Sequence, residues 1–272
     1  MNIAFWSPMH GTGTTSALLA VSIAFSELER KRILLTQTHY NLNNLEYPLL
    51  GDVGEDSFFR DTGIDAALRN FKSGSITEEQ FYDCTIKTGN NLFLLAGTHA
   101  STKEGFENEM VKNMTIHIIH MAGKYYDIVF TDTNSGYGEY SLRMLQSCDA
   151  VVVSLNQNLF VLEQFLKCER FKDKKMFFLF SDYDNKRKYN IKNISSKYRQ
   201  IGKDNYGLIP HCAHFADSVC DKKVYGFITD NLDCDRDHAD YDFFFELKST
   251  VEKLAAFFDA VKTDKTGETE GK

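Results

Sequence analysis

The sequence contains seven short apolar runs in which apolar residues follow one another without alternating with polar ones. Helix-length segments separate most of these runs. A strand with one solvated face would alternate, whereas a strand buried on both faces need not, so the runs predict parallel strands covered by helices on both faces. The predicted fold class is α/β, a doubly wound and mostly parallel sheet. The predicted strands are 3–6, 32–36, 91–96, 127–131, 150–155, 175–180 and 206–209.

The sequence predicts one folded unit rather than several. Its 272 residues are 43% hydrophobic, which is enough to build one large core. None of the three prolines marks a linker that would divide the chain. Near the end, apolar residues at helical spacing predict a core-packing helix, with Leu247, Val251, Leu254, Phe258 and Val261 on one face. We therefore expect a single domain over residues 1–262 and a polar, frayed C-terminal tail over residues 263–272.

Charge and cysteine usage narrow the class of protein. A net charge of −7 argues against a protein that coats nucleic acid over its whole surface. The six cysteines form no CxxC pair, so neither a zinc site nor a disulfide framework is indicated. The sequence shows no signal peptide and no uncharged apolar run of the roughly 18 residues that cross a bilayer. These features predict a cytoplasmic protein without a transmembrane segment.

A glycine-rich loop, residues 7–16, follows the first predicted strand and precedes the helical stretch 17–28. Its core reads His10-Gly11-Thr12-Gly13-Thr14-Thr15-Ser16. Glycines let successive backbone N–H groups turn toward a phosphate, and the helix N-terminus behind them adds partial positive charge. The threonine and serine hydroxyls would then face phosphate oxygens and a magnesium ion. Strand, glycine loop and helix in this order predict a phosphate-binding site.

Asp132 stands at the end of the predicted strand 127–131. An acid in this place can cap a turn, or it can hold a magnesium ion through water. Taken alone, the position favours the turn. Paired with a phosphate-binding loop at the same edge of the sheet, it favours magnesium.

These segments resemble the MinD/ParA superfamily of P-loop ATPases, whose deviant Walker A pattern Lys-Gly-Gly-x-Gly-Lys-Thr aligns with residues 9–15. Thr14 stands in place of the phosphate-binding lysine, and Met9 in place of the lysine that reaches a dimer partner's nucleotide. Thr15 keeps the place of the magnesium ligand. The degenerate loop is most similar to that of TadZ-like pilus-assembly localisation proteins. The resemblance implies ATP and Mg²⁺ as ligands, with His10 as a donor that partly replaces the missing charge.

The resemblance also bears on hydrolysis and on the base. Thr36 and Thr38 stand where the superfamily has two aspartates that help position the attacking water, although an Asn-Leu-acid stretch survives at residues 44–46. We therefore expect no catalytic residue and little or no ATP hydrolysis. Residues 206–211 resemble the superfamily's Gly-x-Ile-Pro turn beside adenine, so Pro210 joins the predicted nucleotide-binding residues.

Other patterns give weaker indications. Residues 11–16 nearly match a dinucleotide fingerprint, but the second strand ends without the acid that binds ribose. Asp233, Asp235 and Asp237 begin like a calcium loop but lack its glycine and its bidentate glutamate. Residues 186–203 carry seven Lys or Arg, which indicates either a solvated helix face or a surface that contacts DNA without sequence preference.

The leading hypothesis is a MinD/ParA/TadZ-like localisation or assembly factor that forms a homodimer and positions pilus or secretion assembly proteins. Such a protein would be cytoplasmic, or peripheral at the inner membrane or a cell pole. One alternative is a slow ParA-type ATPase in DNA partition. Another is a pseudo-ATPase scaffold that binds no nucleotide.

Overall fold

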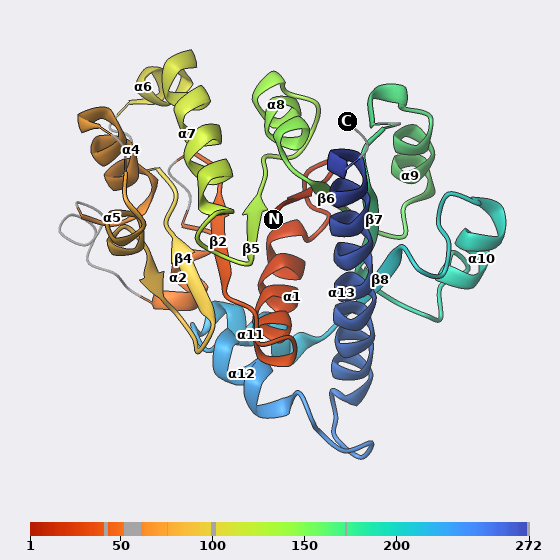
Figure 1. The fold of residues 1–272 in the computed structure, drawn as a ribbon. Helices are drawn as coiled ribbons and strands as arrows, with labels where there is room; N and C mark the ends of the chain where they lie inside the picture. Colours follow the sequence, from red (N-terminus) through yellow and green to blue (C-terminus); the bar gives the residue numbers. More distant parts are fainter. Residues whose placement is uncertain (41–42, 52–60, 75, 99–101, 172, 271–272) are drawn as a thin grey trace.

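The chain folds around one sheet. The structure, a computed structural model, describes residues 1–40, 43–51, 61–74, 76–98, 102–171 and 173–270. Within these residues eight strands form a sheet in the order β3-β4-β2-β5-β1-β6-β7-β8 (Figure 1). All neighbouring strands are parallel except β3 and β4. The strands are β1 Asn2–Trp6, β2 Ile33–Gln37, β3 Ile86–Lys87, β4 Leu92–Leu95, β5 Ile128–Asp132, β6 Ala150–Leu155, β7 Met176–Tyr183 and β8 Tyr206–Pro210.

Helices cover both faces of the sheet, as a parallel sheet requires. One face packs against α1 (Thr14–Leu28), α2 (Glu46–Leu50), α11 (Ala213–Cys220), α12 (Val224–Asn231) and α13 (Tyr241–Glu270). The other face packs mainly against α4 (Gly63–Ser73), α5 (Glu78–Asp83), α7 (Glu109–Ala122), α8 (Glu139–Ser147), α9 (Leu159–Leu166) and α10 (Ile191–Lys197). The short helix α6 (Lys103–Glu107) precedes α7, and a 3₁₀ turn (Glu169–Phe171) follows α9.

The helix α1 is the best-buried helix on its face of the sheet. Its residues from Ala17 to Ser26 are all buried, because α1 contacts the sheet and also packs against α12 and α13. Figure 1 shows α13 running alongside α1 in front of the central strands. Two serines inside the helix, Ser22 and Ser26, donate their hydroxyl hydrogens to backbone carbonyls of Leu19 and Ile23. A polar residue can therefore lie in this apolar setting without an unpaired group.

The sequence-based fold is confirmed. All seven predicted strands are present, and only β7 differs at an end by more than one residue, because it continues through a bulge to Tyr183. The short strand β3 was not predicted, since two residues carry no recognisable period. The helix α13 extends to Glu270, so residues 263–270 are helical rather than the frayed tail that their polarity predicts.

Thr250 joins the edge strand β8 to α13. Its buried hydroxyl accepts from the backbone N–H of Leu208 at 2.8 Å and donates to the carbonyl of the same residue at 3.0 Å. Gly207 leaves room for this contact, because a Cβ there would lie 2.4 Å from Thr250 Cγ2. A single side chain thus satisfies both backbone groups of one edge residue.

We predict that Thr250→Val lowers the free energy of unfolding by about 1–3 kcal/mol, since valine keeps the shape but leaves the Leu208 N–H unpaired in the core. Urea titration followed by circular dichroism measures this change. Thr263→Val is the matched control, because the Thr263 hydroxyl bonds the Asp259 carbonyl on an exposed part of the same helix. Equal effects of the two substitutions would contradict the assignment.

Candidate nucleotide-binding site

The glycine loop connects the central strand β1 to the N-terminus of α1. Gly11 and Gly13 both have φ of 77°, a left-handed conformation that residues with a Cβ adopt only at a cost. Gly13 is also crowded, because a Cβ there would lie 3.2 Å from the Cβ of Ser181. It caps α1 without any side-chain hydrogen bond to the first turn. The helix therefore begins with backbone N–H groups that remain available to an anion.

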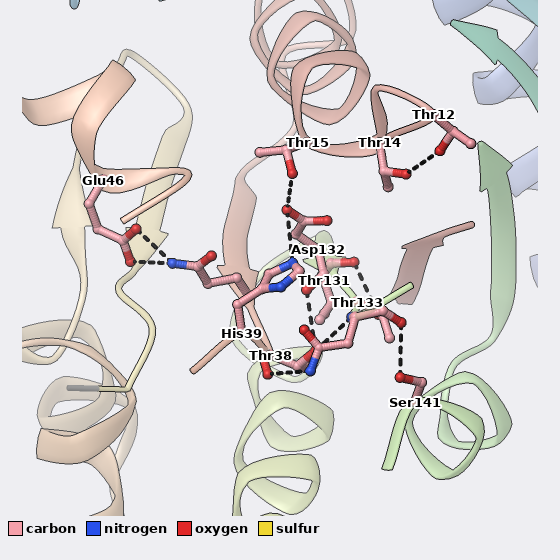
Figure 2. A network of polar contacts seen from close by, with 12 residues as sticks. Thr12, Thr14, Thr15, Thr38, His39, Glu46, Thr131, Asp132, Thr133 and Ser141 are labelled. Carbon is pink, nitrogen blue, oxygen red and sulfur yellow. Dashed lines mark hydrogen bonds and ion pairs between the residues drawn. The ribbon is translucent and has the colours of Figure 1, made fainter. Parts of the chain in front are cut away.

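The hydroxyls of the loop divide into two groups. Thr12 and Thr14 are buried, and their hydroxyl oxygens lie 3.2 Å apart (Figure 2). Thr15 instead donates its hydroxyl hydrogen to Asp132 Oδ2 at 2.6 Å. His10 and Ser16 are exposed, as is Met9. The loop has no Lys or Arg, so an anion here would be held by N–H groups and hydroxyls.

Asp132 ends β5 with its side chain almost wholly buried, at 1% exposure. Its register partner on β1 is Phe5, which places the carboxylate beside the strand that leads into the loop. The Thr15–Asp132 bond joins the start of α1 to the end of β5. A hydroxyl and a carboxylate in contact are oxygen ligands of the kind that Mg²⁺ binds, so Thr15 and Asp132 fit the predicted magnesium ion.

The segment that follows β2 supports Asp132 from a second strand. The backbone N–H of Thr38 donates to the Asp132 carbonyl oxygen at 2.9 Å. Asn134 donates its side-chain amide to the Thr38 carbonyl at 3.1 Å, and its carbonyl accepts from the Ser141 hydroxyl at 2.9 Å. Figure 2 shows these contacts as one connected network. They hold the chain after Asp132 in a fixed path.

His39 approaches the same carboxylate. Its Nε2 lies 3.4 Å from Asp132 Oδ2, and its side chain is 15% exposed. The contact does not have hydrogen-bond geometry, and Nε2 is buried without a hydrogen-bond partner among the described residues. The histidine singled out from the sequence was His10. The structure brings His39, and not His10, against the acid.

Glu46 serves a structural role. Its carboxylate is fully buried and accepts two bonds from Gln37 Nε2, at 2.9 and 2.7 Å, and one from the Gly97 N–H at 2.7 Å. These bonds fasten the first turn of α2 to the ends of β2 and β4. Glu46, the acid of the Asn-Leu-acid stretch, therefore links the carboxyl ends of β2 and β4 and does not face the glycine loop. Thr36, which the resemblance aligns with an aspartate, has a buried hydroxyl with no hydrogen-bond partner in the described part of the chain.

A cavity of about 1200 Å³ lies at the ends of β7 and β8. Pro210 lines it together with Asp182, His211 and Glu246. The bulge at residues 181–183 gives Asp182 a φ of 51°, and His211 Nδ1 lies 2.7 Å from its carboxylate. Burial raises the pKa of Glu246. Ser181, the residue before the cavity-lining Asp182, lies beside the glycine loop, because a Cβ on Gly13 would be 3.2 Å from the Ser181 Cβ.

One other cluster near this cavity has residue types associated with catalysis. Cys212 and His214 both bond Asp240, with Sγ 3.4 Å and Nδ1 2.9 Å from its carboxylate oxygens. Burial raises the pKa of the Cys212 thiol to about 11, so almost none is thiolate at neutral pH. The sulfur accepts from the Phe215 N–H at 3.3 Å and caps α11. The cluster is therefore structural rather than nucleophilic.

No protein-family model matches the sequence, and no curated protein matches it significantly. A ParA family ATPase from Chlorobium tepidum TLS superposes with a TM-score of 0.70 at 14% identity, covering 94% of this chain and 98% of that one. The chain has the fold of the MinD and ParA ATPases.

Two further structures of this fold were solved with nucleotide. MinD from Pyrococcus horikoshii OT3, complexed with Mg-ADP, has a TM-score of 0.65 at 15% identity and covers 93% of this chain and 96% of that one. A plasmid partition protein from Borrelia burgdorferi B31, bound to AMPPNP, has a TM-score of 0.58 at 15% identity and covers 94% and 98%. At this level of identity the likeness establishes the fold alone.

The predicted site residues fall into two places in this MinD/ParA-like fold. Thr15 and Asp132 meet, with the glycines and the other loop residues beside them. Pro210 lines the cavity at the ends of β7 and β8. The sequence analysis missed His39 and Ser181, because neither has a recognisable spacing from the loop. No group of three or more His, Cys, Asp or Glu with the geometry of a metal site occurs in the described residues, nor is any helix there long and apolar enough to span a membrane.

Proposed function

We propose that this chain is a nucleotide-binding localisation factor that binds ATP with Mg²⁺ and hydrolyses it slowly or not at all. The single observation that carries the proposal is the contact between Thr15 and Asp132 at the uncapped N-terminus of α1. It places two oxygen ligands for a cation beside free N–H donors for phosphate. When bound, Mg²⁺ would neutralise phosphate charge there, held by Thr15 directly and by Asp132 through water.

The base and the sugar would extend from the loop toward the cavity at β7 and β8. The buried Ser181 hydroxyl beside Gly13 has no hydrogen-bond partner among the described residues, and a ligand that displaced its neighbours in that direction would give it one. Gly11, Thr12, Gly13, Thr14 and Ser16 would surround the phosphates, with His10 as a donor at the rim and Pro210 beside the base.

Slow turnover follows from what surrounds the loop. Thr36 and Thr38 cannot accept a proton from water as a carboxylate does, and Glu46 already bonds Gln37 and Gly97. Thr38 is also engaged with the Asp132 backbone. The protein would then act as a switch between nucleotide-bound and free states, forming a homodimer that positions pilus or secretion assembly proteins at a membrane or pole. Location, rather than a chemical product, would be its output.

Calorimetric titration of Mg-ATP into the purified protein tests nucleotide binding. We expect saturable binding to the wild type and at least about tenfold weaker binding to Asp132→Asn, because the variant loses the charge that holds the cation. Asp233→Asn is the matched control, since Asp233 is exposed and pairs with Lys248. With EDTA in place of magnesium the difference between variants should disappear. No binding at millimolar ATP would leave the pseudo-ATPase scaffold as the function.

A second candidate function is DNA binding through residues 186–203. Lys186, Arg187 and Lys188 are all exposed in the turn before α10. Lys192 is exposed in α10, and Arg199 and Lys203 are exposed after it. Lys197 is exposed too but pairs with Glu163 at 2.9 Å. A cluster of solvated cations is able to contact DNA phosphates without reading bases. This is the surface that a ParA-type partition ATPase would need.

We predict that any DNA binding depends steeply on salt and uses this stretch. Replacing Lys186, Arg187 and Lys188 by Gln should weaken binding to a nonspecific duplex and reduce the salt slope by about 3, one for each lost phosphate contact. Fluorescence anisotropy at several salt concentrations measures both. A control with Lys72, Lys87 and Lys124 replaced by Gln has the same net charge, and an equal loss in that control would exclude residues 186–188 as the DNA surface.

A further inference from the structure

Three side chains converge at the edge of the sheet where β2 and β5 end. Gln37 and Asp132 are register partners at this edge, and His39 follows two residues after Gln37. Asp132 Oδ2 lies 2.6 Å from the Thr15 hydroxyl and 3.4 Å from His39 Nε2. Figure 2 shows His39 and Thr15 both directed at this carboxylate. The Thr15 hydroxyl and the His39 imidazole nitrogen thus both approach one carboxylate oxygen, Asp132 Oδ2.

The His39 nitrogen lies at ion-pair distance from Asp132 but makes no hydrogen bond to it. Nε2 is buried, and it makes no hydrogen bond within the described part of the chain. A buried polar atom without a partner is destabilising by about 1–3 kcal/mol, so such atoms in folded proteins usually have a missing ligand or another role. Asp132 is the group that Nε2 faces, at a distance longer than a charge-assisted hydrogen bond. A ligand in contact with both atoms would give Nε2 the partner that it lacks.

The spacing of the three groups suits a shared divalent cation. Two ligands about 2.1 Å from one metal ion lie about 3 Å apart when they are adjacent in an octahedron. The observed separations of 2.6 and 3.4 Å bracket that value. A cation bound to Asp132 Oδ2 would therefore be within reach of the Thr15 hydroxyl and of His39 Nε2, with nucleotide oxygens and water in the other positions.

An imidazole ligand changes which ion the site selects. Mg²⁺ prefers oxygen ligands and gives up its waters reluctantly, whereas imidazole favours transition-metal ions, among which Mn²⁺ also suits the oxygen ligands present here. We propose that His39 is a third protein ligand of the cation, beside Thr15 and Asp132, and that the site binds Mn²⁺ more tightly than Mg²⁺. The proposal rests on the proposed function for the role of the cation with nucleotide, but the metal site itself is tested independently.

Paramagnetic resonance of Mn²⁺ bound to the full-length protein tests the proposal. Titration of free Mn²⁺, with and without AMPPNP, gives its affinity, and competition with Mg²⁺ gives the preference. Electron spin echo modulation then reports whether a ¹⁴N nucleus is a ligand. We expect nitrogen coupling in the wild type, and its loss in His39→Asn together with at least about a tenfold fall in the preference for Mn²⁺ over Mg²⁺. His214→Asn, which removes an exposed histidine paired with Asp240, should change neither.

The two proposals fail in different ways. Nitrogen coupling from His39 without any ATP binding would support the metal ligand and overturn the nucleotide switch. ATP binding with equal Mg²⁺ and Mn²⁺ affinities and no nitrogen coupling would overturn the role of His39 and leave the switch intact. Absence of Mn²⁺ binding to the wild type, with or without AMPPNP, would also overturn the metal ligand. The coupling is measured on the wild type, so the result does not depend on the variant folding.

Discussion

The hydrogen bond between Thr15 and Asp132 joins the two parts of the fold on which the site depends. It links the first turn of α1 to the end of β5, a neighbour of the strand that leads into the glycine loop. The burial of α1 fixes one partner, and the parallel register of β5 with β1 and β2 fixes the other. The site is thus a consequence of how a parallel sheet brings strand ends to one edge. The network around Thr38 and Asn134 keeps Asp132 from shifting along that edge.

As the proposed phosphate site, the glycine loop would differ from a lysine-containing loop in the source of its positive charge. Without a lysine, favourable electrostatics at the loop come from uncapped N–H groups, from the dipole of α1 and from any bound cation. A cation is therefore more important here than in a loop that carries its own positive charge. His39 would matter for the same reason. As a further metal ligand it would hold the cation more tightly, and the cation would supply positive charge that lysines supply in other loops. A weakly hydrolysing switch is consistent with threonines where water-positioning acids would be expected.

Much of the fold could be predicted from the sequence, because unbroken apolar runs report burial on both faces. The glycine loop and Asp132 could also be predicted, since each stands at a strand end in a recognisable order. His39 could not, because its meaning depends on the pairing of β2 with β5, which places residues 93 positions apart at one carboxylate. The sequence associates Glu46 with the positioning of the attacking water. Only its bonds to Gln37 and Gly97 show that it joins the ends of two strands. The bulge before Tyr183, which shapes the cavity, has no sequence signature either.

The central claim is that nucleotide phosphates bind to the backbone N–H groups at the start of α1. Amide hydrogen exchange with and without saturating AMPPNP and Mg²⁺ tests it most directly, because exchange reports individual backbone groups. We expect slower exchange of the amides of residues 11–16, and of those following Asp132, while the exposed turn at residues 186–189 is unchanged. Unaltered exchange across residues 11–16 under saturating nucleotide would contradict it.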